Sequence, residues 1–282
     1  MSYEKQTYGT EAARTYLVTS ATGKNGRRVA RRLADRGVTV REGSRRGETV
    51  FDWQAPETWT TALRGVNRVF VSYYPDLASA GAADAMRAFG RAAAEAGVER
   101  LVLLSGRGEP GSETSEAALR DAGVPLTVVR SSWFAQNFNE GEMARGVDQG
   151  EIVFPAGDTP EPFVDLDDVA DVLVAALTEE GTESRTYEVT GPRLLTFADV
   201  AAEISRASGR EVRYVPVSAD EYRALLTEHG VPQDVAQWTA YLFAALLDGH
   251  NASTTTTVRD VLGREPRDFT EYARRAWADG AA

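Results

Sequence analysis

Residues 16–26 read YLVTSATGKNG, an apolar run followed by a polar segment with glycines at 23 and 26. The apolar run predicts a buried strand, and the glycines predict a tight turn that leads into a helix. A helix N-terminus has unpaired N–H groups and a partial positive charge, so a diphosphate can bind there if the nearby side chains are small. This segment therefore predicts the beginning of a dinucleotide-binding fold.

The spacing Ser20-x-x-Gly23-x-x-Gly26 is a variant of the glycine fingerprint of such folds, with serine at the first position. By itself this spacing matches many turns. An apolar stripe over residues 27–36 predicts a helix, however, and residues 38–40 predict a second strand, which together complete a βαβ unit. The alternative is a turn that only connects a strand to a helix. Serine crowds the phosphate turn slightly, and we expect its hydroxyl to compensate by donating to a phosphate oxygen.

The residues after the second strand indicate which dinucleotide is bound. A carboxylate there would accept hydrogen bonds from the ribose of NAD, whereas arginine would pair with the 2′-phosphate of NADP. The chain has Ser44, Arg45 and Arg46 at this point, and we expect Glu42 to lie within the strand. We therefore predict a preference for NADP(H), with NAD(H) possible. A solvated basic loop is the alternative.

Composition excludes several classes of function. The formal net charge of −11 argues against general nucleic-acid affinity, and the absence of cysteine excludes disulfides and thiolate chemistry. The two histidines, His229 and His250, are too far apart in sequence to suggest a metal site. No apolar run is long enough to span a membrane, and the first residues lack a signal-peptide pattern, so we expect a cytoplasmic protein with a small-molecule substrate. The sequence does not indicate an oligomeric state.

The remaining pattern predicts an α/β fold, a Rossmann-type doubly wound parallel sheet with a small, mostly helical C-terminal cap. We assign residues 14–155 to the dinucleotide-binding domain, with residues 163–190 returning to it, and residues 191–282 to the cap. Further strands are expected at 49–51, 68–72, 101–104, 126–129, 185–189 and 212–215, and further helices at 56–63, 82–96, 114–121, 196–207, 219–228 and 235–247. The acidic residues of 164–172 fit the first turn of another helix.

A dense arginine cluster is predicted to form a solvated face of the first helix, opposite its apolar stripe. Its members are Arg27, Arg28, Arg31, Arg32 and Arg36.

With these segments in view, the chain resembles the atypical short-chain dehydrogenases of the NmrA-like group. Within that group it is most similar to the branch of the fungal ergot-alkaloid iminium reductases, of the agroclavine or festuclavine dehydrogenase kind. The resemblance covers nearly the whole chain and rests on the motifs at 19–26, 44–45, 51–53, 103–108, 130–138, 162–165, 187–192 and 247–252. It implies NADP(H) binding and hydride transfer to a small organic acceptor such as an iminium or imine. The group also includes proteins that resemble non-catalytic redox sensors, and a quinone reductase or isomerase on the same fold is a further alternative.

The chemistry expected of the site is limited by what the sequence lacks. No tyrosine is followed four residues later by lysine, so the Tyr-x-x-x-Lys pair of many short-chain dehydrogenases is absent and ordinary ketone reduction is disfavoured. An iminium needs less help, because hydride reaches a carbon that is already cationic. Positioning and an aromatic cage for the cation would then provide most of the catalysis. If a proton donor is needed, Tyr74 or Asp165 could supply it.

The predicted site residues follow from the motifs and from their positions at strand ends, with core packing as the alternative for the aromatic ones. For the cofactor they are Thr19, Ser20, Thr22, Gly23, Lys24, Asn25, Gly26, Ser44, Arg45, Arg46, Asp52, Trp53, Tyr73, Ser105 and Gly106. For catalysis they are Tyr74, Ser105, Trp133 and Asn137, and for substrate binding Trp133, Phe134, Asn137 and Phe138.

Overall fold

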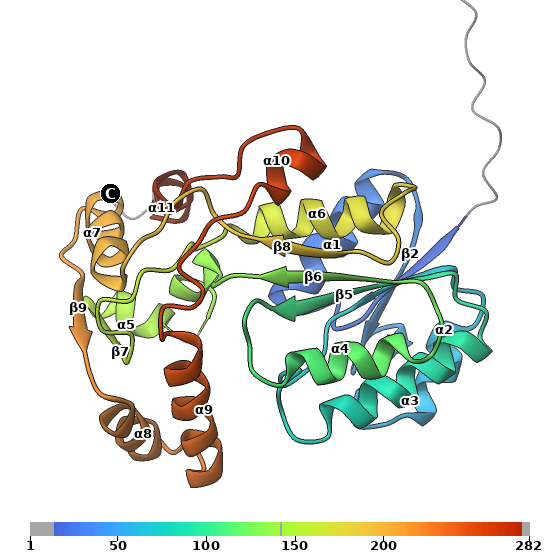
Figure 1. Ribbon diagram of the computed structural model, residues 1–282, viewed down its shortest axis with the longest axis horizontal. Helices are drawn as coiled ribbons and strands as arrows, with labels where there is room; N and C mark the ends of the chain where they lie inside the picture. Colours follow the sequence, from blue (N-terminus) through green and yellow to red (C-terminus); the bar gives the residue numbers. More distant parts are fainter. Residues whose placement is uncertain (1–13, 142, 278–282) are drawn as a thin grey trace, which may run out of the picture.

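Seven parallel strands form the central sheet of the computed structural model, which describes residues 14–141 and 143–277 (Figure 1). Their order across the sheet is β3-β2-β1-β4-β5-β6-β8, so the predicted doubly wound parallel sheet is confirmed. The strands are β1 (Thr15–Val18), β2 (Thr39–Ser44), β3 (Thr49–Val50), β4 (Arg68–Val71), β5 (Arg100–Gly106), β6 (Leu126–Ser131) and β8 (Thr186–Val189). The order of connection reverses between β1 and β4, and open α/β sheets bind their ligands beyond the strand ends at such a point.

Helices cover both faces of this sheet, as Figure 1 shows. One face carries α1 (Lys24–Asp35), α6 (Leu166–Thr178) and α10 (Thr257–Leu262), and the other carries α2 (Glu57–Leu63), α3 (Ala82–Glu95) and α4 (Ser112–Arg120). All four residues of β4 are buried, because this central strand is covered on both sides. The continuous apolar runs of the sequence therefore mark the centre of the sheet.

The cap is built around a second, two-stranded parallel sheet of β7 (Glu151–Phe154) and β9 (Arg213–Pro216). Its other elements are the 3-10 turn η1 (Ala135–Phe138), α5 (Ala144–Asp148), α7 (Phe197–Ser208), α8 (Ala219–Glu228), α9 (Gln233–Leu246) and α11 (Phe269–Trp277). Aromatic side chains fill its core: Phe154 and Phe197 stack with their ring centroids 5.0 Å apart.

Two elements make contacts across the division between sheet and cap that the sequence predicts. The expected boundary at residue 155 puts α5 and β7 with the dinucleotide-binding domain, whereas β7 pairs with β9 in the cap. The expected cap of residues 191–282 includes α10, which instead packs on the sheet side, where Val258 is buried in the same apolar cluster as α1 and α6. Short elements without a clear apolar period gave no signal for these positions.

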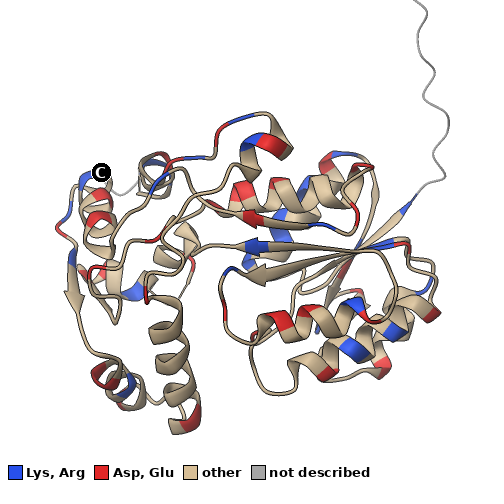
Figure 2. Ribbon diagram, viewed as in Figure 1, with Lys and Arg blue, Asp and Glu red and all other residues tan. Residues whose placement is uncertain are grey.

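Part of the arginine cluster on α1 is not the solvated face that the sequence predicts. Arg32 donates to Asp171 at 2.7 Å and to Asp167 at 2.8 Å, both on α6, and Arg28 pairs with Glu140. Figure 2 shows blue and red residues interleaved where α1 meets α6. Arg31 remains exposed, so only part of the cluster faces solvent.

No helix among residues 14–141 and 143–277 is both long enough and apolar enough to cross a membrane.

Candidate functional site

The loop between β1 and α1 forms a cradle with an open helix N-terminus. Gly23 precedes α1 in an extended conformation, and no side chain of the described residues caps the helix there, so the helix N-terminus faces the loop without a side-chain cap. At Gly26 a Cβ atom would lie 2.2 Å from the carbonyl oxygen of Ser20, so only glycine permits this close approach of helix and loop. These are the two properties that a diphosphate site requires.

Ser20 takes a different role from the one expected for its hydroxyl. Its φ of 52° lies in the left-handed region, and its Oγ donates to the carbonyl oxygen of Ser72 at 2.9 Å. The hydroxyl proton is therefore engaged with the end of β4, and the serine stabilises the turn through the backbone rather than offering its proton to a phosphate.

A cavity of about 370 Å³ opens in front of this loop. We call it the Arg45 cavity. It is lined by Ser20, Thr22, Gly23, Lys24, Asn25, Gly26, Ser44, Arg45, Phe51, Asp52, Trp53, Gln54, Ser72, Tyr73, Tyr74 and Pro75. Glu42 lies inside β2, as expected, so Ser44 and Arg45 stand at the strand end. Within the cavity Asn25 Oδ1 is buried and accepts no hydrogen bond from any described residue, which leaves an acceptor available to a ligand.

A second cavity, of about 350 Å³, lies between the strand ends and the cap. We call it the cap cavity. It shares five residues with the Arg45 cavity, namely Lys24, Asn25, Ser72, Tyr73 and Pro75. Its walls include Trp133 and Phe134 after β6, and Phe243 of α9. The two cavities thus adjoin, one at the glycine loop and one beneath the cap.

Lys24 lies where the cavities meet. Its ammonium group donates to Asn137 Oδ1 in η1 and lies 5.4 Å from the centre of the Phe134 ring, a cation–π distance. One side chain therefore connects the glycine loop to the segment that follows β6.

The predicted residues fall into three groups. Seventeen of the twenty line one or both cavities, and Thr19, Arg46 and Phe138 line neither. Thr19 is fully buried and bonds to the backbone of Phe70 and Ser72, so it holds β1 to β4 instead of lining a cavity. Arg46 lines neither cavity, and Tyr74 lines only the Arg45 cavity, where it is 66% exposed.

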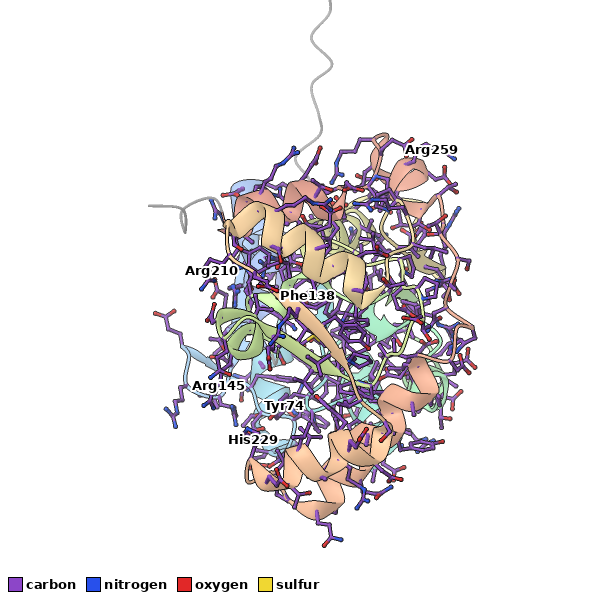
Figure 3. The ribbon with its side chains drawn as sticks, turned by 90° about the vertical axis from the view of Figure 1, so that its left-hand side faces the viewer. Tyr74, Phe138, Arg145, Arg210, His229 and Arg259 are labelled. Carbon is purple, nitrogen blue, oxygen red and sulfur yellow. The ribbon has the colours of Figure 1, made fainter. Side chains whose placement is uncertain are left out.

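Phe138 lies away from both cavities. It is fully buried in the cap core, with Phe163 at 5.6 Å and Phe269 at 5.9 Å between ring centroids. Figure 3 labels it in the interior of the molecule. The side chain follows Asn137 in a 3-10 turn, so the two point in different directions, and we leave Phe138 out of the proposed site.

Trp53 combines the two roles that the sequence left open for it. Its indole N–H donates to the carbonyl oxygen of Ser72 at 2.9 Å, and its ring packs against Phe51 and Phe89 in the core. One part of the residue still lines the Arg45 cavity. It is therefore a core anchor that also forms part of the cavity wall.

Ser105 lines the cap cavity, but its proton is engaged. Its Oγ donates to Glu116 Oε1 at 2.7 Å, and Arg130 holds both oxygens of the same carboxylate, at 2.9 and 2.7 Å. The hydrogen bond from Arg130 to Glu116 and the negative charge of that carboxylate raise the pKa of Arg130. Ser105 can accept a hydrogen bond from a ligand in this arrangement, but its donor is already used.

Asp165 has a structural role at the start of α6. It accepts hydrogen bonds from the backbone N–H of Asp167 at 2.9 Å and from the side-chain amide of Gln136 at 2.7 Å. It also forms an ion pair with Arg275. This confirms the expected helix start. Asp165 lines neither cavity, which removes it as a proton donor.

Three carboxyl groups that sequence reasoning missed line the cap cavity: Asp76, Glu109 and Glu161. Burial, and then the negative charge of Asp76, raise the pKa of Glu109 to about 8, and burial raises the pKa of Glu161 to about 7. Asp76 follows β4 and Glu109 follows β5, two neighbouring strands. Their positions beyond these strand ends were the only sequence signal that could have found them.

Two family models match the chain. The model of the NmrA-like family matches residues 113–273, and a model described as NAD(P)H-binding matches residues 20–180. Each spans more than half of the chain, and together they include both cavities' walls.

Similar proteins of known name support the same grouping. The NAD(P)H azoreductase of Xenophilus azovorans is 34% identical over 90% of this chain and 88% of its own length. Agroclavine dehydrogenase of Claviceps fusiformis is 31% identical over 92% of this chain and 96% of its own. The Citrobacter triphenylmethane reductase, solved with NADP(H), has a TM-score of 0.73 and 25% identity over 93% of this chain and 99% of that one. The resemblance inferred from the motifs is thereby confirmed.

Proposed function

The chain belongs to the NmrA-like family of NAD(P)H-binding proteins, and we propose that it is an NADPH-dependent reductase of a small organic acceptor such as an imine or iminium. The named relatives include an azoreductase and a dehydrogenase, which supports an oxidoreductase as the class of enzyme.

The residues present fit a phosphorylated dinucleotide. The open N-terminus of α1, the close approach at Gly26 and the unpaired Asn25 Oδ1 offer donors, space and an acceptor beside the Arg45 cavity. Ser44 and Arg45 line the cavity at the end of β2, where a 2′-phosphate would be recognised. When bound, the reduced dinucleotide supplies a hydride. The NADP(H) in the triphenylmethane reductase structure supports the same preference here.

The cap cavity fits a flat, unsaturated acceptor. Trp133 and Phe134 form one side and Phe243 of the cap adds an apolar surface, which would exclude water and hold the acceptor against the sheet. The absence of a Tyr-x-x-x-Lys pair argues for an acceptor that is more electron-poor than a simple ketone.

The observation that carries this proposal is that the Arg45 cavity and the cap cavity adjoin through Lys24, Asn25 and Tyr73. A protein that only senses the cofactor needs the first cavity alone. A reductase needs a second space, next to the first, in which an acceptor can meet the bound cofactor.

The test is to mix the purified full-length chain with NADPH and a panel of imines, iminium ions, quinones and enones, and to follow the loss of reduced-cofactor absorbance. We expect oxidation of NADPH with at least one C=N acceptor, faster than with NADH. Tight NADPH binding with no oxidation by any acceptor would instead support a sensor. Oxidation of NADPH with quinones but with no C=N acceptor would instead support a quinone reductase.

A further inference from the structure

Asp76 and Glu109 form a carboxyl pair on the wall of the cap cavity. Asp76 lies in the connection after β4 and Glu109 in the connection after β5, and the pairing of these two strands brings the connections together. The two carboxyl groups are hydrogen-bonded to each other. The pair therefore lies beyond the carboxyl ends of β4 and β5, next to the reversal of strand order between β1 and β4 at which open α/β sheets bind their ligands.

The position of Glu109 is fixed by its surroundings. Its side chain folds over Gly106 at the end of β5, so closely that a Cβ on Gly106 would lie 2.4 Å from Glu109 Oε2. The hydroxyl of Ser112 donates to the same oxygen. Asp76 is held in turn by the backbone N–H of Ala78, which donates to its Oδ1 at 2.7 Å. The absence of a side chain at position 106 is therefore what leaves room for this carboxyl group.

The charges around the pair favour one retained proton. Among residues 14–141 and 143–277, no cation forms an ion pair with Asp76 or Glu109. Two arginines at the ends of β5 and β6 pair with other carboxylates: Arg130 pairs with Glu113 and Glu116, and Arg107 pairs with Glu188. The charge of Glu116 adds to that of Asp76 in raising the pKa of Glu109. Two half-buried carboxylates that lie together without a paired cation cannot both ionise easily, so the pair keeps a proton at neutral pH.

A separate observation points to a polar ligand in the same cavity. Glu161 is 2% exposed, and its Oε1 accepts no hydrogen bond from any described residue. The indole N–H of Trp133 on the same cavity wall is also buried without a partner. A buried carboxylate oxygen and a buried donor left unpaired are costly unless a ligand pairs with them. The cavity is thus built for a ligand that has both a donor and an acceptor.

We propose that Glu109 is the proton donor of the cap cavity, with Asp76 as its positioning residue, and that the substrate class is therefore a neutral imine rather than a permanent iminium ion. This deepens the proposed function and rests on it. The Oε–H bond of Glu109 breaks as an N–H bond forms on the imine nitrogen. The carbon of the resulting C=N⁺ group takes the hydride that the reduced dinucleotide supplies, and the π electrons become the nitrogen lone pair of the amine. Glu109 is left as a carboxylate and regains its proton from solvent.

The experiment compares a neutral cyclic imine with its N-methyl iminium ion, which has one more methyl group and a permanent positive charge. Positioned acids contribute about 10²- to 10⁴-fold to such steps. E109Q, which keeps the shape of the side chain, is expected to lower kcat for the neutral imine at least about 100-fold more than kcat for the iminium ion. E113Q is the matched control, since Glu113 is exposed on α4 and lines neither cavity. It is expected to leave the ratio of the two rates within about twofold of wild type.

A second readout needs neither cofactor nor substrate. In a carbon NMR titration of protein labelled at the glutamate carboxyl groups, one resonance should titrate near pH 8 and be absent from E109Q. D76N removes the neighbouring charge, so it should move this titration, and the alkaline limb of the pH–rate profile for the neutral imine, to lower pH. Circular dichroism verifies that both variants fold.

Equal losses for the two acceptors in E109Q, or no carboxyl group that titrates well above its usual range, would overturn the assignment of Glu109 while leaving the reductase intact. If wild-type protein reduces neither of these two acceptors nor any other imine or iminium ion, the proposed function fails and this proposal fails with it.

Discussion

Lys24, in the first turn of α1, donates a hydrogen bond to Asn137, which follows it by 113 residues. The contact joins the glycine loop to the segment after β6 at the point where the two cavities meet. A ligand that spans both cavities must pass this side chain. The pair is therefore the physical link between the place where a cofactor would be held and the place where an acceptor would react.

Removing the charge of Lys24 should weaken dinucleotide binding. A hydrogen bond to a charged group contributes about 1.5–3 kcal/mol, so K24Q is expected to raise the Kd for NADPH about tenfold or more. N137A leaves the ammonium group in place, and its Kd should change less than about threefold. Fluorescence titration of NADPH measures both. A larger loss in N137A than in K24Q would contradict the role given to the charge.

Arg45 and its neighbour Arg46 provide a matched pair of variants. Arg45 lines the Arg45 cavity, whereas Arg46 lines neither cavity. R45A should weaken NADPH binding about 10- to 100-fold and NADH binding little, because only NADPH carries the 2′-phosphate. R46A should change both affinities less than about threefold. The test is to measure the dissociation constants of NADPH and NADH for R45A and for R46A. Equal effects of R45A on both dinucleotides would count against recognition of the 2′-phosphate.

Gly26 should tolerate no side chain. G26A places a methyl group 2.2 Å from the Ser20 carbonyl oxygen, which forces α1 away from the loop and costs about 2 kcal/mol or more. The comparison is G37A, where φ is +74° but nothing lies within 4 Å, so only backbone strain of about 1 kcal/mol is expected. Urea unfolding of both variants gives the two free energies. A smaller loss in G26A than in G37A would mean that the helix and loop are not as closely packed as described.

The ion pair of Asp268 with Arg193 should make stability depend on pH in the acid range. Arg193 donates to both oxygens of Asp268, at 2.6 and 2.9 Å, and these hydrogen bonds lower the pKa of the carboxyl group below its ordinary 3.8. A lowered pKa stabilises the fold above about pH 4, and this contribution is lost as the pH falls further. D268N should therefore cost about 1 kcal/mol at pH 7 and measurably less at pH 3, where the carboxyl group of the unfolded chain is already largely protonated.

Unfolding free energies at the two pH values test this prediction. D220N is the control, because the Asp220–Arg223 pair is exposed on α8 and should contribute less than about 0.5 kcal/mol at either pH. A cost of D268N that is the same at pH 3 and pH 7 would exclude a contribution from the charged pair.

The strands at the centre of the sheet were predictable because they are buried on both faces. β4 and β5 appear in the sequence as continuous apolar runs for this reason. The start of α1 was expected at Arg27, three residues late, because Gly23 gives no side-chain capping signal. The cap strand β7 has only four residues and lies between short elements, so the sequence shows no hydrophobic pattern that predicts it or its pairing with the distant β9.

The candidate site was predictable where it depends on one continuous segment. The glycine fingerprint of residues 20–26 and Ser44–Arg45 both line the Arg45 cavity. They were predictable because the loop after β1 and the end of β2 each take a conformation that neighbouring residues determine. Asp76 and Glu109 lie 33 residues apart in sequence and meet only through the pairing of β4 with β5. Arg28 and Arg32 were taken as solvated for a similar reason, since their partners on α6 and near η1 come more than 100 residues later.

The most direct measurement for the central claim is isothermal titration calorimetry of the folded, full-length chain with NADPH and with NADH, alongside G26A. We predict saturable binding of both cofactors, with NADPH at least about tenfold tighter, and loss of both signals in G26A. Tighter binding of NADH, or no heat from either dinucleotide with wild-type protein, would contradict the claim that the glycine loop and Arg45 hold a phosphorylated dinucleotide.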